Sequence, residues 1–447
     1  MAVDKKFINV FLLGLAFMLI FTAFQTIGNI QKTILENISE EDPDFSGDGY
    51  TSLAIIYAVF AVLNWSAPSV ISIIGPKFAM VFGAVTYVLF ILSFLVPRTW
   101  LLYVASVVIG IGAPMIWTGQ GNYLTLNSTP ATISRNSGIF WAMLQASMFI
   151  GNLFVYIQFQ GLDKIDKSTR SMVIWVLTGI AITGTFVVLF LPKPKSDENT
   201  VKPSDNRGPV QALKDAGKLF FTKKMLLLSI TFFYTGIELS FYSGVYSPSI
   251  GFTKQLGDIS TQLVGLSGIF IGLGEVMGGA LFGILGAKTV RWGRDPIIVG
   301  GFIVHVVAFF TIFLNLPNTA PFGNTTEEAF ISTNAYLAIF CSFLLGLGDA
   351  CFNTQVYSIL GDVFADDSAS GFAIFKFTQS VAAAACFFYS SYIGLYIQLG
   401  ILLALAVFGT ICFVLVEWSV KKDKSNSQAS ISSSTSDLES EVSGKYS

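Results

Sequence analysis

The chain has 447 residues, of which 53% are hydrophobic and 12% are charged, and its formal net charge is −2. Ordinary soluble domains carry about a quarter charged residues, so this composition excludes most soluble classes. The small net charge and the lack of a basic, aromatic-rich block exclude nucleic acid as an expected partner.

The apolar residues are gathered in blocks of about twenty, the length that a helix needs to cross the hydrocarbon layer of a bilayer. We therefore predict an all-α, multi-pass protein embedded in the lipid bilayer. The first block is longer than a signal-peptide core, so we expect it to be retained. The apolar runs predict twelve spans, at residues 7–28, 51–74, 77–97, 100–122, 137–160, 171–191, 225–247, 262–286, 296–316, 336–357, 371–396 and 398–417.

The longest internal polar stretch divides these spans six and six. The predicted units are an N-terminal six-helix bundle at 1–191, a cytoplasmic linker at 192–224, a C-terminal six-helix bundle at 225–418 and a disordered cytoplasmic tail at 419–447. The linker ends in a helical apolar stripe after Pro209, which fits either a short surface helix or a mostly disordered segment. The Ser-rich, acidic tail has too few apolar residues to form a core.

Most lysines and arginines fall in segments on the same side as the N-terminus, which predicts that both termini are cytoplasmic. The sequence does not distinguish the plasma membrane from an endomembrane. Two N-x-S/T sequons lie in the largest loops on the opposite side, so Asn37 and Asn324 are candidate glycosylation sites.

An internal repeat relates the two halves. The segment "IFWAMLQ" at 139–145 resembles "IFKFTQ" at 374–379, and "TGQ" at 118–120 resembles "TQ" at 354–355. Ile374 follows Ile139 by 235 residues, and Gln355 follows Gln120 by the same offset. This pattern is typical of transporters built from two parallel six-helix units.

Charge within the spans is confined almost entirely to the second half. The ionisable residues there are Glu238, Glu275, Asp349, Lys376 and the single histidine, His305. An acid at mid-membrane costs about 2.5–3.5 kcal/mol on insertion scales, so we expect these groups to face protein or water. We interpret His305 as a helix-packing residue rather than a proton relay.

Two polar stripes recur at helical spacing. They consist of Thr231, Thr235, Glu238 and Tyr242 in span seven, and of Ser342, Gly346, Asp349 and Asn353 in span ten. The stripes predict either an aqueous cavity that binds solute or a cation, or buried structural hydrogen bonds. The candidate cavity or coupling residues are Glu238, Asp349, Lys376, Gln120, Gln355 and Asn353. For Lys376, the sequence is compatible with an ion pair to Asp349 or with snorkelling to the cytoplasmic surface.

Span eight contains the segment "IGLGEVMGG", in which Gly268, Gly272, Glu275 and Gly279 share one helical face. Small residues at this spacing favour close helix packing. A dinucleotide-binding turn is excluded because no strand precedes the glycines. We predict that Glu275 is a helix-interface acid, protonated or hydrogen-bonded, rather than a gating residue.

No signal for an enzyme is present. The four cysteines all lie in apolar blocks, which predicts neither disulfides nor a zinc site. No nucleophile motif, phosphate-binding loop or pair of metal ligands occurs, so we expect no catalytic residues, no metal and no cofactor.

Twelve spans in two halves around a central linker resemble the major facilitator superfamily. Five segments are similar to its Unc-93-like family: "FTAFQTIGNIQKTI", "SGDGYTSLAIIYAVFA", "IGIGAPMIWTGQGNYLT", "NSGIFWAMLQAS" and "FLLGLGDACFNTQ". The resemblance covers residues 5–418 without much of the linker. It implies either an orphan solute carrier that moves an unknown small solute by alternating access, or a non-transporting accessory subunit of another membrane protein, such as a potassium channel or a trafficked receptor.

The match to the superfamily's loop signature, G-x-L-x-D-R-x-G-R, is partial. The segment "GILGAKTVRWGRDP" keeps Gly283, Leu285, Gly293 and Arg294 but has no acid at the aspartate position. The arginine that many proton-coupled members carry in span four has no counterpart, because no residue from 101 to 121 is charged. The resemblance therefore does not extend to standard proton coupling.

Overall fold

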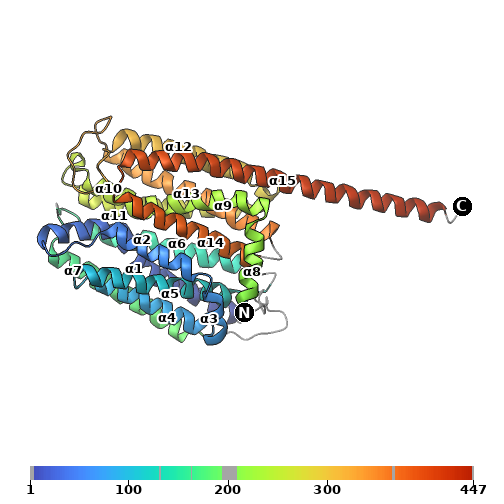
Figure 1. The fold of residues 1–447 in the computed structure, drawn as a ribbon, viewed down its shortest axis with the longest axis horizontal. Coiled ribbons are helices and arrows are strands. Elements are labelled where there is room, and N and C mark those ends of the chain that lie inside the picture. Colours follow the sequence, from blue (N-terminus) through green and yellow to red (C-terminus); the bar gives the residue numbers. More distant parts are fainter. Residues whose placement is uncertain (1–4, 130–131, 163, 194–208, 365–367, 445–447) are drawn as a thin grey trace.

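A computed structural model describes residues 5–129, 132–162, 164–193, 209–364 and 368–444. These residues form an almost entirely helical bundle, as predicted (Figure 1). Its elements are α1 (Lys5–Glu41), α2 (Gly49–Leu63), α3 (Ala67–Ile74), α4 (Pro76–Ser93), α5 (Thr99–Leu126), α6 (Ile133–Gln158), α7 (Lys167–Phe190), α8 (Pro209–Phe220), α9 (Lys223–Ser240), η1 (Phe241–Tyr246), α10 (Ser247–Phe252), η2 (Lys254–Leu256), α11 (Ser260–Trp292), α12 (Asp295–Asn315), α13 (Ala335–Val363), α14 (Ser368–Ser390) and α15 (Leu395–Gly444).

Among the described residues, 11 helices are long and apolar enough to cross a membrane, and Gly49–Leu63 is a shorter apolar helix. The predicted span at 51–74 is therefore interrupted. Helix α2 ends at Leu63 and α3 begins at Ala67. Pro68 lies in the first turn of α3, where its missing N–H removes no helical hydrogen bond.

The predicted span at 225–247 is longer than expected, because α9 continues through η1 and α10 to Phe252. η1 is a π-helical turn that directly precedes Pro248 in the first turn of α10. Such turns are rare and frequent at functional sites. Here the turn contacts α1 of the other half.

Two ends of the bundle can be distinguished in Figure 1. The α8 end carries the start of α1 and helix α8, and the opposite, Asp48 end carries the loop before α2. We call α1–α7 the N half and α9–α15 the C half. The blue to cyan helices of the N half lie beside the green to red helices of the C half.

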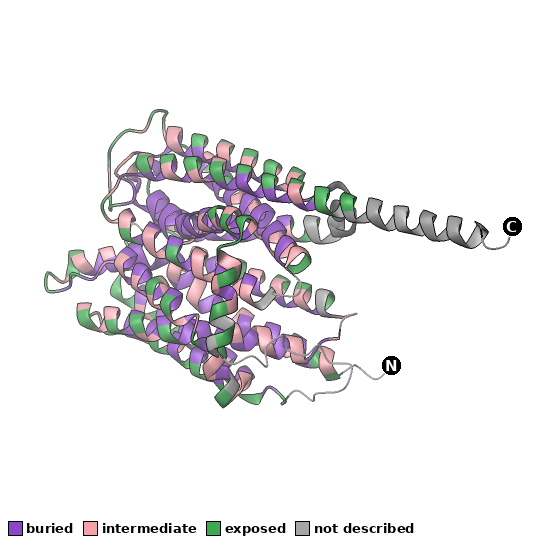
Figure 2. Ribbon diagram, turned by 45° about the vertical axis from the view of Figure 1, so that its right-hand side comes forward, coloured by how far each residue is buried: buried purple, intermediate pink, exposed green. Residues whose placement is uncertain are grey.

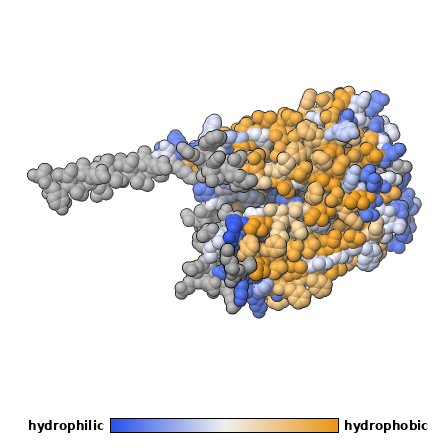
Figure 3. All heavy atoms as spheres, turned by 180° about the vertical axis from the view of Figure 1, so that it is seen from behind, coloured by the Kyte–Doolittle hydropathy of each residue, from blue (hydrophilic) through white to orange (hydrophobic). Residues whose placement is uncertain are grey.

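The outer faces of the helices are apolar, as lipid contact requires. Buried side chains lie between the helices and exposed ones on their outer surfaces (Figure 2). A broad hydrophobic belt covers the face seen in Figure 3, with hydrophilic residues toward its ends. Exposed aromatic side chains mark the edges of the belt: Trp100, Tyr336 and Tyr392 at the Asp48 end and Trp418 toward the α8 end. The protein is thus an integral membrane protein.

Helix α8 packs against α14 and α9 at the α8 end, so the structure contains the surface helix rather than a wholly disordered linker. Ala216 belongs to the apolar stripe predicted after Pro209, and its side chain is buried on the packed side of α8. The predicted side-chain positions of Val210 and Leu213, and residues 194–208 of the linker, lie outside the described residues.

Helix α15 extends to Gly444, where the sequence predicts a disordered tail from residue 419. The segment contains no proline, and no glycine before Gly444, so nothing in it interrupts a helical backbone. The extension projects away from the bundle (Figure 1). Because an isolated helix without packing is marginally stable in water, disorder of the tail in solution stays a prediction.

The close approach of α11 to α13 depends on Gly346. A Cβ at Gly346 would lie against the Ile271 carbonyl group and 3.1 Å from the Glu275 backbone nitrogen. We expect Gly346→Ala to force the two helices apart and to lower the free energy of unfolding by about 1–3 kcal/mol. The thermal unfolding midpoint of the purified protein in detergent measures this loss.

The matched control for this substitution is Gly300→Ala in α12. A Cβ at Gly300 would meet no other atom within 4 Å. We expect its unfolding midpoint to equal that of the unaltered protein. Equal loss in both variants would show that helical glycines, rather than this contact, control stability.

Candidate functional site

The Asp48 end is closed by polar contacts between the halves. Lys32 Nζ lies 2.8 Å from Asp48 Oδ2, and the Ser391 hydroxyl of the C half donates to Asp48 Oδ1 at 2.9 Å. Nearby, the Tyr50 hydroxyl donates to the Pro321 carbonyl oxygen at 3.0 Å. These contacts join α1, α2 and two loops of the C half across the same gap.

Asp48 also begins helix α2. Its carboxylate accepts a hydrogen bond of 2.7 Å from the Thr51 backbone nitrogen, as an N-cap residue does. Partial burial raises the pKa of Asp48, but the Lys32 ammonium and the Thr51 hydrogen bonds outweigh it, so the pKa lies below the usual value of 3.8. Asp48 is therefore ionised at neutral pH and binds both halves as an anion.

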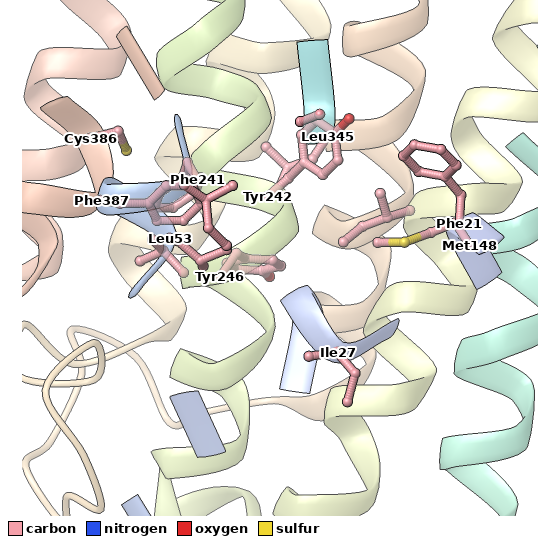
Figure 4. Close-up of a cluster of buried hydrophobic side chains, with 14 of the residues drawn as sticks. Phe21, Ile27, Leu53, Met148, Phe241, Tyr242, Tyr246, Leu345, Cys386 and Phe387 are labelled. Atoms are coloured by element: carbon pink, nitrogen blue, oxygen red, sulfur yellow. The ribbon is translucent and has the colours of Figure 1, made fainter. Parts of the chain in front are cut away.

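A continuous apolar layer lies below this polar closure. Figure 4 shows Leu53 of the N half beside Phe241, Tyr246 and Phe387 of the C half, with Phe21, Ile27 and Met148 of the N half further across the same hydrophobic cluster. Helix α1 packs on η1 and α10 in this layer. The side chains that join the halves here are rings and aliphatic groups.

Three aromatic side chains meet between the halves on the far side of this layer. They are Trp117 on α5, Trp141 on α6 and Tyr357 on α13. The Trp117 and Trp141 rings stack with centroids 5.9 Å apart, and the Trp141 and Tyr357 centroids are 5.3 Å apart. The rings thus form one surface that both halves share, which we call the aromatic cage.

Small residues follow the aromatic cage toward the α8 end. One turn nearer to that end, each of the three helices has a glycine on the same side: Gly121, Gly138 and Gly361. A Cβ at any of these glycines would meet no other atom within 4 Å, so there is local space beside each of them. The halves still touch on this side of the cage, where Asn64 donates to the Ala373 carbonyl oxygen at 3.4 Å.

Lys376 of α14 reaches into the aromatic cage. Its Nζ lies 6.0 Å from the Trp117 ring centroid, 5.7 Å from that of Tyr357 and 4.8 Å from that of Phe375. It donates a hydrogen bond of 3.0 Å to Gln379 Oε1. The side chain is half-buried, so it is not sealed by the protein.

The structure contains neither of the two arrangements that the sequence offered for Lys376, an ion pair with Asp349 or an extension to the cytoplasmic surface. Among the described residues, no ion pair joins Lys376 to Asp349 or to another carboxylate. The side chain also does not snorkel to the cytoplasmic surface, because rings from both halves surround it. Lys376 is a cation without a counter-charge in the described part of the chain.

The acids Glu238 and Asp349 lie in a separate cluster inside the C half, with His305. His305 Nε2 lies 3.2 Å from the Leu345 carbonyl oxygen and 3.3 Å from Glu238 Oε1. Since a carbonyl oxygen only accepts, Nε2 carries a hydrogen, and Nδ1 is bonded to the Tyr234 hydroxyl. The neutral imidazole satisfies this geometry without a further proton.

Asp349 completes the cluster. Asn353 Nδ2 donates to Asp349 Oδ1 at 2.7 Å, and the Asp349 carboxyl group interacts electrostatically with Glu238 and His305. Glu238 is 1% exposed and Asp349 5%, so water does not supply the remaining partners. The described residues contain no group of three or more side chains suited to a metal ion.

The polar stripe of span seven does not line one cavity. Thr231 donates to the Gly409 carbonyl oxygen of α15, whereas Thr235 accepts from Gln379 of α14. Glu238 faces His305 of α12. For α9 these contacts fit the second alternative, buried structural hydrogen bonds, because three neighbouring helices pack on the positions that share this spacing.

Glu275 lies at a contact between the halves. Gln145 Nε2 of α6 donates to Glu275 Oε2 at 2.8 Å, and Glu275 is 4% exposed. On the same face, Gly268 and Gly272 approach α6 closely, while a Cβ at Gly279 would meet nothing within 4 Å. The small-residue face is therefore shorter than the sequence predicts and ends at Glu275.

The remaining candidates lie elsewhere. Gln120 is buried on α5, and Gln355 donates to Thr354 Oγ1 at 3.0 Å. The described hydrogen bonds do not join either amide to Lys376 or to the acid cluster. Of the predicted cavity residues, the structure brings together only Glu238, Asp349 and Asn353.

The asparagine side chains of the two sequons differ in their exposure to solvent. Asn324 is exposed in the loop between α12 and α13, where it donates to Glu40 Oε1 at 3.2 Å. Asn37 is only 7% exposed, because α1 continues to Glu41 rather than ending in a loop. Glycosylation at Asn37 does not fit the structure, since its buried amide has no room for a sugar.

Arg294, which belongs to the partly matched loop signature, forms a cluster of ion pairs within the C half. Arg294 Nη1 lies 2.8 Å from Glu417 Oε2, and Nη2 lies 2.5 Å from Asp362 Oδ2. Arg294 Nε donates to the Ser358 hydroxyl at 2.8 Å. These bonds tie the start of α12 to α13 and α15 at the α8 end. The side chains of Gly283 and Leu285 lie outside the described residues.

Sequence reasoning missed the aromatic cage and assigned His305 no part in an ionisable cluster. One signal for the cage was present in the repeat, because the offset of 235 residues pairs Trp141 with Lys376. The repeat thus places a ring in one half where the other half has a cation. No spacing indicated that His305 and Glu238, on different helices, would meet.

Residues 44–414 match the protein family described as ion channel regulatory protein UNC-93. The chain is 46% identical to the UNC93-like protein MFSD11 of Xenopus tropicalis, over 94% of this chain and 98% of that protein. It is 28% identical to the UNC93-like protein 3 of Arabidopsis thaliana, over 90% and 84% of the two chains. The protein unc-93 homolog A of Bos taurus is 25% identical, over 90% and 92%.

Among solved structures, the chain is similar to a crystal structure of the peptide transporter POT in complex with alafosfalin. The TM-score is 0.65, and the match covers 93% of this chain and 95% of that one. Sequence identity is 13%, so this similarity concerns the fold alone. It confirms the predicted major facilitator fold.

Replacing Asp48 with asparagine tests the closure at the Asp48 end. Asn caps a helix as well as Asp does, so Asp48→Asn removes only the charge. We expect a loss of about 1 kcal/mol in the free energy of unfolding at neutral pH. Because the folded pKa is lowered, the ionised form contributes its full stability above pH 3.8 and loses it as pH falls through the folded value.

The difference between Asp48→Asn and the unaltered protein should therefore be constant from pH 7 to pH 4 and shrink below that. Thermal unfolding across this range measures it. Asp166 is a matched control, because it caps α7 but has no ion pair among the described residues. A loss of equal size in Asp166→Asn would contradict a special role for Asp48.

Substitution of Glu275 separates its hydrogen bond from its charge. Glu275→Gln retains an acceptor for Gln145, so we expect its unfolding midpoint to remain unchanged. Glu275→Ala leaves the Gln145 amide without its partner and should cost about 1–3 kcal/mol. Thermal unfolding in detergent measures both; equal destabilisation by the two substitutions would show that the carboxyl group itself is needed.

Proposed function

The chain belongs to the UNC-93 family, and we propose that it is a solute carrier that works by alternating access. The observation that carries this proposal is the half-buried Lys376 in the aromatic cage between the halves. A site shared by two halves is where carriers of this architecture bind their solute. The solute itself is small enough to fit between helices.

The asymmetry of the two ends supports the same proposal. At the Asp48 end, the halves meet through Asp48, Ser391 and an apolar layer, whereas Gly361, between the cage and the α8 end, is exposed and has no atom within 4 Å of its Cβ position. An alternating carrier has one closed and one open end in each state. The closing polar contacts are few and lie near the surface, so they are weak enough to exchange.

Glu238 and Asp349 fit a coupling role better than solute binding. They are buried in the C half, where Glu238 faces His305 and Asp349 accepts from Asn353. Lys376, by contrast, is bonded to Gln379, which in turn bonds Thr235 one turn from Glu238. We propose that this chain of contacts links the state of the acid cluster to the solute site.

A second candidate function is a non-transporting accessory subunit of another membrane protein. The description of the matching family as ion channel regulatory favours it. Affinity purification from native membranes, followed by mass spectrometry, tests this alternative. A stoichiometric channel or receptor in the purified material, together with a rigid bundle in the experiment below, would support an accessory role.

Cysteine labelling of the purified protein tests alternating access without knowledge of the solute. The four native cysteines are buried, so they contribute little background. We expect a maleimide to label Gly361→Cys quickly and Ser391→Cys slowly. Adding Asp48→Ala removes the closure, so labelling should slow several-fold at position 361 and speed up at position 391.

The control is Thr326→Cys, which is exposed in the loop at the Asp48 end and should be labelled at one rate in both backgrounds. Opposite changes at the two test positions indicate exchange between two states. Unchanged rates, or rates that rise together, would contradict alternating access, because they indicate a rigid or a loosened bundle.

A further inference from the structure

The charge of Lys376 is unbalanced in its surroundings. A cation at membrane depth is costly unless a partner or water compensates it. The described partners of Lys376 are the amide oxygen of Gln379, at 3.0 Å, and three aromatic ring faces. An amide oxygen and ring faces stabilise an ammonium group but leave its full positive charge in place.

The acids of the same half are already engaged elsewhere. Glu238 and Asp349 contact each other and are bonded by His305 and Asn353, and Glu275 accepts from Gln145. All three are at most 5% exposed. None of them forms an ion pair with Lys376 in the described part of the chain, so its ammonium group is available to pair with an anion from outside the protein.

The surface around Lys376 is suited to a flat apolar group. Trp117 and Trp141 stack at an interplanar angle of 19°, and Tyr357 closes the third side. All three rings are half-buried, so each keeps some accessible surface. Aromatic surfaces contribute most to binding when another ring or apolar plate covers them.

We propose that the aromatic cage binds an organic anion, with its carboxylate on Lys376 and its aromatic body on Trp117, Trp141 and Tyr357. The proposal that this anion is transported rests on the proposed carrier function, whereas the proposal that it binds in the cage does not. The anion enters from the α8 end, which is the end nearer to Tyr357 on α13 and to Lys376 on α14. Because the rings belong to both halves, a bound anion also bridges them.

A charge series with one ring system tests the proposal on the unaltered protein. The probes are 1-naphthaleneacetate, the neutral 1-naphthaleneacetamide and the cationic 1-naphthylethylamine, with binding measured by titration calorimetry in detergent. A charge-assisted hydrogen bond predicts that the anion binds at least about tenfold more tightly than the other two probes. Equal or tighter binding of the amine would overturn the proposal.

Variants then assign the site. Lys376→Gln should weaken binding of the anion about tenfold or more, with little effect on the amide, whereas Lys376→Arg retains the charge and should retain the preference. Trp117→Leu should weaken all probes that bind, since they share the ring. Lys214→Gln, on the exposed surface of α8, is the matched control and should change nothing. Unaltered anion affinity in Lys376→Gln would overturn the assignment.

Oleate distinguishes a lipid source from a soluble one. Binding of oleate without binding of 1-naphthaleneacetate would overturn the aromatic anion in favour of a membrane lipid anion. Uptake of bound probe into proteoliposomes separates the proposal from the proposed function. If the probe binds in a way that depends on Lys376 but is not taken up, the carrier function is rejected and the anion site is retained. If neutral or cationic solutes are taken up and Lys376→Gln does not change this uptake, the anion site is rejected and the carrier function is retained.

Discussion

An ionisable side chain inside a hydrocarbon layer must find its partners within the protein, and the arrangement of this bundle depends on that constraint. The three acids of the C half meet it by bonding to neighbouring helices: Glu238 and Asp349 lie with His305, and Glu275 lies on Gln145. The Lys376 ammonium group finds its partners differently, because ring faces from both halves surround it. The acids therefore join helices by direct contacts with neighbouring side chains, while the cation lies among rings between the halves.

The interface between the halves combines two kinds of contact with different strengths. The apolar layer shown in Figure 4 excludes water and is non-directional, so the halves can slide or rock while it stays covered. The polar closure at Asp48 is directional and contributes little net free energy near a surface. A closure of this kind can exchange between two states of similar free energy, as a ligand-driven change requires.

Helical periodicity identified faces correctly but not their neighbours. Thr231, Thr235 and Glu238 share a spacing, yet they contact α15, α14 and α12 respectively, because a central helix has neighbours on all sides. The same limit applies to Glu275, whose glycine face could be recognised in sequence although its partner Gln145 lies 130 residues away. Spacing within one helix carries no information on which other helix packs against it.

The sequence by itself determined the class of the protein, the approximate placement of its apolar helices and the confinement of charge within them to the second half, since these follow from composition and local periodicity. Only the tertiary structure decided which charges meet. It placed His305 beside Glu238, left Lys376 among rings rather than beside Asp349, buried Asn37 within α1, and closed one end through Asp48. The reason is physical: ion pairs, ring contacts and access to water depend on how separate helices are arranged in space.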